Sequence, residues 1–532
     1  MRKFSSYGPI DTDLHYYAPR TALIEQALTH LLGENSGKSG HYITVWAPRQ
    51  RGKTWIMQQV LFRLRHEPYS QQFDVLKLNL EHLKIEQDVD DIVRTIAGQI
   101  IEGLALRDVA INHLKEFGNL FKKDVLSRPL ILIMDEFDAL SQPAITGLAG
   151  VFRNIYHQRQ DEGDKPIEQK SYLLHGVALI GVRAALGVEN ITGSPFNVQR
   201  SLHIPNLTAQ EVEGMFKWYE QESGQKVEPT VIERVFYETQ GQPGLTCWFG
   251  ELLTETYNKH ASTLTMRDFE IAYAAAVDAL PNANVLNIIS KARQEPYQSL
   301  VLEMFQTDEK IPFRYDDRQI NFLYLNGVVD QEVVAETTRY VKFSCPFIQK
   351  RLFNYFAYDL FREMGQLYDP FENLEDTITP DSLHLKNLLR RYERYLKKNR
   401  DWLLKDAPRR TDLRLYEAVY HFNLYMFLAH FLQRRGGQVF PEFPTGNGKI
   451  DLIIRYSRQA YGLEVKSFTD EFGYREALQQ AARYGQQLGL TEIGLALFVE
   501  SVDEANRQKY EAIYKDEESG LVVVPIFIET GN

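Results

Sequence analysis

Short apolar runs alternate with longer stretches of helical spacing between residues 20 and 290. Four of the runs are compact enough to be strands, and they span residues 42–47, 73–80, 129–137 and 176–182. Strands that are apolar on both faces and separated by helices are typical of a parallel sheet covered on each side. The pattern predicts an α/β core over 1–205. Residues 206–295 carry helical spacing alone, which predicts a helical lid.

The pattern changes after residue 295. Residues 296–362 give a helix, a mixed segment, a strand and a helix, the order of a winged-helix-like module. Packing against a neighbouring domain is favoured over DNA contact for such a module. Residues 363–381 are acidic and proline-punctuated, which predicts a linker. Residues 382–532 begin with helices and continue with five strands and one helix, which predicts a second α/β domain.

Composition narrows the class of protein. The chain has 532 residues, of which 44% are hydrophobic and 25% charged, so it is globular rather than disordered. The net charge of -11 excludes a generally basic nucleic-acid coat, so any DNA-binding surface must be local. Cys247 and Cys345 lack the spacing of a zinc site. The first 17 residues have no apolar signal core, and the most apolar stretch, 415–432, contains Glu and His. We expect a cytoplasmic protein without membrane spans.

A phosphate-binding loop follows the first strand. Residues 47–54 read Ala-Pro-Arg-Gln-Arg-Gly-Lys-Thr and fit GxxxxGK[ST] except at Ala47. Such a loop directs backbone N–H groups at phosphates, with Lys53 at the β- and γ-phosphates and Thr54 on Mg²⁺. A chance match in a polar loop is the alternative, and the flanking strand and helix argue against it. The predicted nucleotide contacts are Arg49, Gln50, Arg51, Gly52, Lys53, Thr54 and Trp55.

Two carboxylates end the third strand. Asp135 and Glu136 follow the apolar residues 131–134. A carboxylate at the end of a buried strand needs a cation, and nucleotide-bound Mg²⁺ supplies one. We expect Asp135 to orient the Mg²⁺ shell and Glu136 to polarise the attacking water.

These residues resemble AAA-like and STAND-type P-loop ATPases over about residues 10–360. The segment 15–20, HYYAPR, resembles the stretch that covers the adenine in those proteins. LIGVR at 179–183 resembles the strand ending in a polar sensor, which implies that Arg183 contacts the γ-phosphate. GQPG at 241–244 resembles the GxP motif of the lid, which implies that Pro243 packs near the base. SPFN at 194–197 also resembles a motif of AAA-like domains, without an assigned role. The cofactors implied are ATP and Mg²⁺. No arginine finger is identified, so a second copy of the chain or another protein remains an open partner.

A second group of charges lies in the C-terminal domain. Asp451 precedes Glu464 by thirteen residues, and Lys466 follows on the same strand face as Glu464. If the two strands are neighbours, these groups converge, and the two carboxylates with the carbonyl of Val465 suit Mg²⁺ or Mn²⁺. Lys466 would orient water or offset charge on the phosphate. Glu417, on the preceding helix, is a further candidate carboxylate.

Residues 410–500 resemble the PD-(D/E)XK nucleases. Gln480 and Tyr484 resemble the QxxxY motif of the RecB-like branch and share one helix face. No proline precedes Asp451, as in many members. The alternative is a set of merely solvated charges, or a degenerate domain without activity. A basic stretch at 386–414 either follows a phosphate backbone or is a solvated amphipathic helix, and the two readings are equally supported.

The sequence therefore predicts an ATP-binding and ATP-hydrolysing protein coupled to metal-dependent hydrolysis of DNA. A role in defence against foreign DNA is suggested by analogy with similar fusions of an ATPase and a nuclease domain. The alternative is a nucleotide-switched signalling or scaffold protein whose nuclease-like domain only binds a partner.

Overall fold

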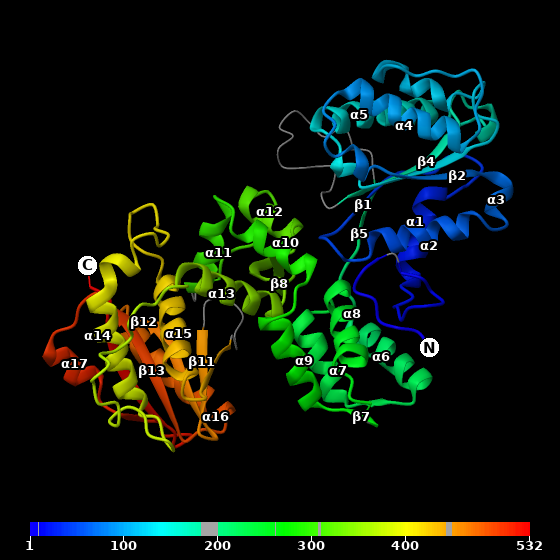
Figure 1. Ribbon diagram of the computed structural model, residues 1–532. Helices are drawn as coiled ribbons and strands as arrows, with labels where there is room; N and C mark the ends of the chain where they lie inside the picture. The colour runs from blue at the N-terminus through cyan, green and yellow to red at the C-terminus, as the bar shows by residue number, and fades with distance from the viewer. Residues whose placement is uncertain (9, 182–199, 261, 307–309, 443–449, 532) are drawn as a thin grey trace. The chain divides into compact units, whose positions relative to one another are not determined.

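The computed structural model describes residues 1–8, 10–181, 200–260, 262–306, 310–442 and 450–531. The chain forms two compact units (Figure 1). Unit 1 is Met1–Asn284 with Tyr315–Gly327, and unit 2 is Val285–Arg314 with Val328–Asn532. The chain therefore passes from one unit to the other three times.

Unit 1 contains a five-stranded parallel sheet in the order β2-β3-β4-β1-β5. The parallel α/β core predicted from the apolar runs is confirmed. Because β4 lies between β1 and β3, the strand before the phosphate loop and the strand before the two carboxylates are not neighbours. The strands are β1 (Tyr42–Trp46), β2 (Asp74–Asn79), β3 (Leu130–Asp135), β4 (Leu174–Gly181) and β5 (Arg200–His203).

Helices cover both faces of this sheet (Figure 1). Leu130, Leu132 and Met134 of β3 pack with α4 (Val89–Gly103) and α5 (Gln142–Asp161). Ile131 and Ile133 pack on the other face with α1 (Thr21–Leu32) and α2 (Lys53–Leu64). Successive side chains of a strand point to opposite faces, so an unbroken apolar strand requires two cores. A short helix, α3 (Tyr69–Gln72), leads into β2.

The predicted lid is helical, with one addition. A capping box between Thr208 and Glu211 starts the first helix, since each residue satisfies a backbone N–H of the other. A two-residue parallel pair, β6 (Lys226–Val227) with β7 (Thr263–Leu264), was not predicted. The lid helices are α6 (Ala209–Ser223), α7 (Pro229–Thr239), α8 (Pro243–Glu251), continued by a π-helical turn, and α9 (Met266–Asp278).

The two helices and the strand expected within 296–362 are present, and the mixed segment between them contains a further helix and a strand that forms a hairpin with the expected one. These elements are divided between the units. α12 (Arg318–Leu325) belongs to unit 1, where the ring of Trp46 at the end of β1 lies 6.0 Å from Tyr315 and 6.4 Å from Tyr324. The remaining elements belong to unit 2. They are α11 (Tyr297–Gln306), β8 (Val329–Ala335), β9 (Thr338–Phe343) and α13 (Pro346–Leu360), preceded by α10 (Ala283–Ala292).

Within unit 2, α11 and α13 share a core with α15 (Glu417–Gln433). The ring of Phe422 on α15 lies 5.7 Å from Phe305 and 5.0 Å from Phe353. The predicted linker 363–381 also lies in this unit, against α14 (Leu385–Leu403).

Unit 2 carries the predicted C-terminal sheet, which is mixed and ordered β10-β11-β12-β13-β15-β14. β11 pairs antiparallel with β12, whereas β12, β13 and β15 run parallel. α16 (Glu471–Gln487) covers one face, and α17 (Glu504–Tyr510) precedes β14. The strands are β10 (Gln438–Glu442), β11 (Ile450–Tyr456), β12 (Gln459–Ser467), β13 (Glu492–Val499), β14 (Tyr514–Lys515) and β15 (Val522–Glu529). In the described parts of the chain, no helix is long and apolar enough to cross a membrane.

Candidate functional site

The loop between β1 and α2 has the backbone of a phosphate cradle. Gly52 has φ +86° and begins α2, and Gln50 has φ +56°. A Cβ added at Gly52 would have nothing within 4 Å, so the glycine is needed for backbone conformation rather than for space. The free N–H groups of the first turn of α2 face this loop, which favours an anion there. Arg49 is exposed, whereas Arg51 and Trp55 are buried.

Lys53 is buried under its own loop. Its Nζ donates to the carbonyl oxygens of Ala47 at 2.9 Å and Pro48 at 3.1 Å. Burial lowers the pKa of Lys53 to about 8, and the carboxylates of Asp138, Glu136 and Asp135 oppose that shift. The ammonium group of Lys53 thus already donates to oxygen atoms of the loop, and a bound phosphate presents acceptors of the same kind.

Asp135 and Thr54 come together at the carboxyl edge of the sheet. Thr54 Oγ1 lies 3.5 Å from Asp135 Oδ1, although 81 residues separate them in sequence. Asp135 is only 2% exposed and forms an ion pair with Lys77 of β2 at 3.0 Å. A hydroxyl and a carboxylate at this distance are oxygen ligands suited to Mg²⁺. The residues present therefore fit the metal predicted from the sequence.

Glu136 is held in a strained conformation. Its φ is +54°, in the left-handed region that non-glycine residues rarely adopt, and its N–H donates to Asp135 Oδ1 at 3.1 Å. Burial raises the pKa of Glu136, and the nearby Asp138 raises it further. A carboxylate with a raised pKa beside Lys53 suits a group that accepts a proton from water.

The lid touches the phosphate loop directly. Gly244 N–H donates to Gln50 O at 3.3 Å, and the side chain of Gln242 donates to Arg49 O at 3.4 Å. A Cβ at Gly244 would lie 2.2 Å from Gln50 Oε1 and 2.9 Å from Gln50 Cβ. Pro243 begins α8 between these two contacts. The GQPG segment thus lies on the loop, as expected of a lid that closes over a nucleotide.

Aromatic rings connect the N-terminal segment to the loop helix and the lid. The Tyr17 ring lies 5.4 Å from Trp55 of α2 and 5.4 Å from Trp218 of α6. The Arg20 guanidinium donates to the carbonyl oxygens of Pro205 and Asn206. These contacts support the adenine-covering role that the resemblance implied for residues 15–20.

The sequence pattern did not identify Lys77 or Trp218 as part of this region, and some predicted residues cannot be placed. Lys77 was detectable, because a lysine in the middle of an apolar strand needs a buried partner. Tyr17 belongs to the segment 15–20 that the sequence had already indicated, whereas Trp218 carried no signal beyond its aromatic character. Arg183 and the SPFN segment lie outside the described residues.

The C-terminal sheet brings the second group together in register. Asp451 of β11 stands directly opposite Glu464 of β12 in the antiparallel ladder. Lys466 Nζ lies 4.0 Å from Glu464 Oε1, and Glu464 is 1% exposed. Val465 is buried between Ile450 and Ala496. The two strands are therefore neighbours, as predicted. The structure does not describe the side chain of Asp451.

The QxxxY helix covers the face of Glu464. Glu464 stands beside Leu495 in the parallel ladder, and Leu495 packs with Tyr484 of α16 in one core. Gln480 is half-buried and Tyr484 is buried on that helix. Strand neighbours in register share a face, so α16 covers the face that carries Glu464 and Lys466.

The helix before the sheet, α15, carries the predicted Glu417 and a buried histidine. Glu417 is exposed at the first position of α15, and its N–H donates to Gln306 Oε1 at 2.8 Å. One turn later, His421 is 3% exposed, and burial together with the charge of Lys466 lowers its pKa to about 3. Neither ring nitrogen of His421 has a hydrogen-bond partner among the described residues. In the sequence, the feature that marks His421 is a histidine within an otherwise apolar helical stretch.

A metal centre in this unit has only partial support. Among the side chains that the structure describes, no group of three His, Cys, Asp or Glu is placed to hold a metal. Glu464 supplies one carboxylate, and the backbone of Asp451 stands directly opposite Glu464 in the ladder.

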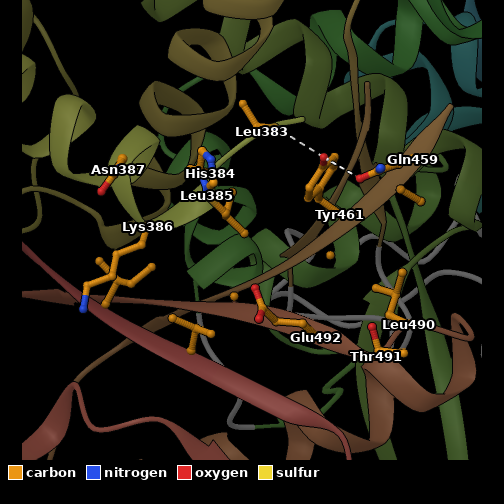
Figure 2. A pocket seen from close by; sticks show the side chains of 15 residues that line it. Leu383, His384, Leu385, Lys386, Asn387, Gln459, Tyr461, Leu490, Thr491 and Glu492 are labelled. Atoms are coloured by element: carbon orange, nitrogen blue, oxygen red, sulfur yellow. Dashed lines mark hydrogen bonds between the residues drawn. The ribbon is translucent and has the colours of Figure 1, made fainter. Parts of the chain in front are cut away.

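A hollow of about 330 Å³ lies elsewhere on the same sheet (Figure 2). Figure 2 shows Tyr461 between Leu383 and Gln459, with hydrogen bonds of 3.0 and 2.8 Å. The hollow includes Gly494, whose Cβ would lie 2.6 Å from Leu385 of α14. Gly494 is paired with Leu463 and therefore belongs to the face opposite Glu464. This hollow is not part of the carboxylate–lysine group.

The basic stretch is largely paired within its own unit. Arg391 contacts Glu372 and Asp376 of the predicted linker, both at 2.5 Å. Arg390 forms an ion pair with Glu511, and Lys397 forms one with Glu529. Charges neutralised in this way are poor candidates for phosphate contacts, which favours the structural reading for α14.

Comparison with known proteins identifies one part of the chain. Residues 6–258 match the family model described as "AAA-like domain". Together with the parallel sheet and the loop, the match shows an AAA-like P-loop ATPase domain. A search of curated proteins gave no match.

Solved structures resemble the chain at low identity. The Walker-type ATPase of Pyrococcus abyssi is 14% identical, with a TM-score of 0.38 over 66% of this chain and 99% of that one. The Aeropyrum pernix ORC2 protein in its ADPNP–ADP complexes is 16% identical, with a TM-score of 0.38 over 65% and 96%. The Thermotoga maritima RuvB Holliday junction branch migration motor is 12% identical, with a TM-score of 0.34 over 63% and 94%. Values this low do not indicate a shared activity or partner.

Proposed function

We propose that the AAA-like P-loop ATPase domain of this chain binds and hydrolyses ATP, and that the C-terminal unit cleaves DNA with a divalent metal. The observation that supports the first half best is the meeting of Thr54 and Asp135 beside buried Lys53. Lys53 and Thr54 begin α2 directly after the β1 loop, and Asp135 ends β3. Because β4 separates β1 from β3, the fold itself assembles the site.

Each residue of the nucleotide site has a distinct task in this proposal. Lys53 offsets charge on the β- and γ-phosphates, and Thr54 and Asp135 hold Mg²⁺, which neutralises charge that develops on the phosphates. Glu136 positions the attacking water and accepts its proton. Lys77 fixes the Asp135 carboxylate through their ion pair. Arg183 and Pro243 remain proposed contacts of the γ-phosphate and the base.

Glu136→Gln should separate binding from turnover. The amide keeps the shape of the side chain and removes the base, so ATP affinity should stay near that of the parent while hydrolysis slows about 10²–10⁴-fold. Calorimetry and phosphate release measure the two quantities. Unchanged turnover would place the water-polarising group elsewhere. Glu168→Gln, at an exposed glutamate of the same unit, is the matched control.

The nuclease half is supported by the register of Asp451 with Glu464 and by the closeness of Lys466. The two carboxylates and the Val465 carbonyl would hold Mg²⁺ or Mn²⁺, which generates hydroxide at neutral pH. Lys466 would hold that water in line with the phosphate, with Gln480 and Tyr484 along the same face. Glu417 remains a proposed additional carboxylate from α15. His421 of the same helix packs against Phe498 at 5.7 Å, and Phe498 pairs with Ser467 and so lies on the face opposite Lys466.

A second candidate function keeps the ATPase half and removes cleavage. The pairing of Arg390, Arg391 and Lys397 with carboxylates of their own unit favours it, since a DNA-cutting unit needs free cations. The C-terminal unit would then bind a protein partner, or a second copy, under nucleotide control.

Metal binding and cleavage distinguish the two candidates. Glu464→Ala should weaken Mn²⁺ binding, whereas Lys466→Ala should keep the metal and lose cleavage, because a charged amine offers no lone pair. Mn²⁺ calorimetry and cutting of single-stranded and plasmid DNA, each with and without ATP, measure both effects. Lys515→Ala is the control for a lysine on the same sheet. Absence of Mn²⁺ binding to the parent, even with DNA present, would favour the partner-binding function.

A further inference from the structure

A second hollow lies at the carboxyl end of α15, in unit 2, and has a volume of about 560 Å³. The segment 362–370 forms one wall, and the last turn of α15 with Arg434 forms the other. This volume is in the range of sites for small organic ligands, about 300–1,000 Å³. We name it the α15 hollow.

The lining of the α15 hollow is cationic. Arg362 and Arg434 both line it, and no acidic side chain does. In the described parts of the chain, neither arginine forms an ion pair, in contrast to Arg390 and Arg391 of α14. His430 adds an imidazole whose buried Nδ1 has no hydrogen-bond partner among the described residues. Glu363 and Asp369 belong to the wall segment but are not among the residues that line the hollow. The lining side chains therefore carry net positive charge and one buried ring nitrogen without a hydrogen-bond partner among the described residues.

The helix end beside the hollow does not cancel this charge. The last carbonyls of a helix normally carry partial negative charge. Here the Leu432 carbonyl accepts from the N–H groups of Arg435 at 2.8 Å and Gly437 at 3.1 Å. The Phe431 carbonyl accepts from the Arg435 guanidinium at 2.7 Å. Both carbonyl groups are already hydrogen-bonded within the fold, so Arg362 and Arg434 determine the charge of the hollow.

The walls are fixed by contacts of their own. The carbonyl of Met364 accepts from Tyr395 at 2.7 Å, and Tyr368 accepts from Arg435 at 2.9 Å. Gly365 has φ +61°, and a Cβ there would lie 3.1 Å from the Trp402 ring. A hollow held open in this way loses little entropy when a ligand enters.

We propose that the α15 hollow binds a nucleoside phosphate as a second ligand of this chain, apart from the phosphate loop of unit 1. The planar guanidinium forks of Arg362 and Arg434 match a phosphate. The Tyr368 ring and the side-chain amides of Gln366 and Gln433 give a flat surface and hydrogen-bonding groups for a base. Inorganic phosphate would use only the arginines, and a DNA strand would extend beyond the hollow.

AMP is the probe, because it lacks the β-phosphate that the phosphate loop grips. Calorimetry of the full chain should show AMP binding that Lys53→Ala leaves unchanged. Arg362→Ala with Arg434→Ala should weaken AMP at least tenfold and leave ATP affinity unaltered. Tyr368→Leu should weaken AMP without affecting inorganic phosphate. Lys398→Ala with Lys405→Ala, two exposed lysines of the same unit, is the matched control and should change nothing.

Four outcomes would overturn the proposal. The parent chain could bind no AMP at about 1 mM, or AMP binding could disappear in Lys53→Ala. Inorganic phosphate could bind as tightly as AMP, or the arginine pair could weaken a single-stranded oligonucleotide and not AMP. If the double variant does not fold, Arg434→Lys replaces it as the test. Lysine keeps the positive charge but lacks the planar guanidinium, so a loss of AMP affinity smaller than that expected of the double variant supports the proposed phosphate contact. None of these results bears on ATP turnover, so the proposed function is tested independently.

Discussion

At the scale of single residues, the nucleotide site depends on charges that the fold keeps out of water. Lys53 is 8% exposed and is held by carbonyl oxygens of its own loop, and Asp135 is 2% exposed and is held by Lys77 of β2. Burial of charged groups is costly unless they are paired, so their positions indicate function rather than stability.

Lys53→Ala should weaken ATP binding by about 30-fold or more, since removing one partner of a buried charge pair costs about 2–5 kcal/mol. Calorimetry measures the affinity, and circular dichroism checks that the fold is kept. Arg65→Ala, just after α2, is the control for loss of a cation near this helix. Equal affinity in parent and variant would remove the phosphate-loop assignment.

Candidate residues could be named from the sequence where a spacing rule exists. The motif located Lys53 and Thr54, and the apolar strand located Asp135, which lies 3.5 Å from Thr54. Lys77 and His421 were missed because each needs a partner that is distant in sequence and is revealed only by the fold. Glu417 was chosen by analogy, although its exposed position leaves it outside the buried group.

At the scale of elements, the contact between α8 and the phosphate loop is the most specific feature. The close approach exists only because residue 244 has no side chain. The obstructing atoms all belong to Gln50, whose positive φ a glycine adopts without strain.

Gly244→Ala should therefore displace Gln50 and weaken ATP binding, by about tenfold for a displacement that costs about 1–2 kcal/mol. Gln50→Gly combined with Gly244→Ala should restore much of the loss, because all three obstructing atoms are removed. Gly214→Ala on α6, where a Cβ meets nothing within 4 Å, is the control. Calorimetry of the parent, Gly244→Ala, Gln50→Gly and the double variant completes a double-mutant cycle, and additive effects would mean that the contact does not matter for the nucleotide.

Elements were predictable where apolar residues repeat over several turns or a whole strand. β3 and β4 are buried along their entire length, and their runs were clear in the sequence. The β6–β7 pair is two residues long, too short for alternation to be recognised. The acidic segment 363–381 was predicted from local charge alone, and local charge does not reveal that Arg391 pairs with it.

At the scale of the whole molecule, each unit has its own sheet, so the two proposed activities should be separable. Asp451→Ala should abolish DNA cleavage and leave ATP turnover within about twofold of the parent, because β11 belongs to unit 2 alone. Parallel assays of phosphate release and DNA cutting measure this. Loss of both activities in a folded variant would mean that the two sites depend on one another.

The division into units could not be predicted from sequence. Residues 315–327 lie in the segment whose sequence pattern is mixed, and the contacts of the Tyr315 and Tyr324 rings with Trp46 that join it to the ATPase sheet become apparent from the fold. The threefold passage of the chain restricts how the protein can be recombined. A chimera joined at one point after Asn284 would separate Trp46 from α12, so exchange of the C-terminal unit with another protein requires three junctions.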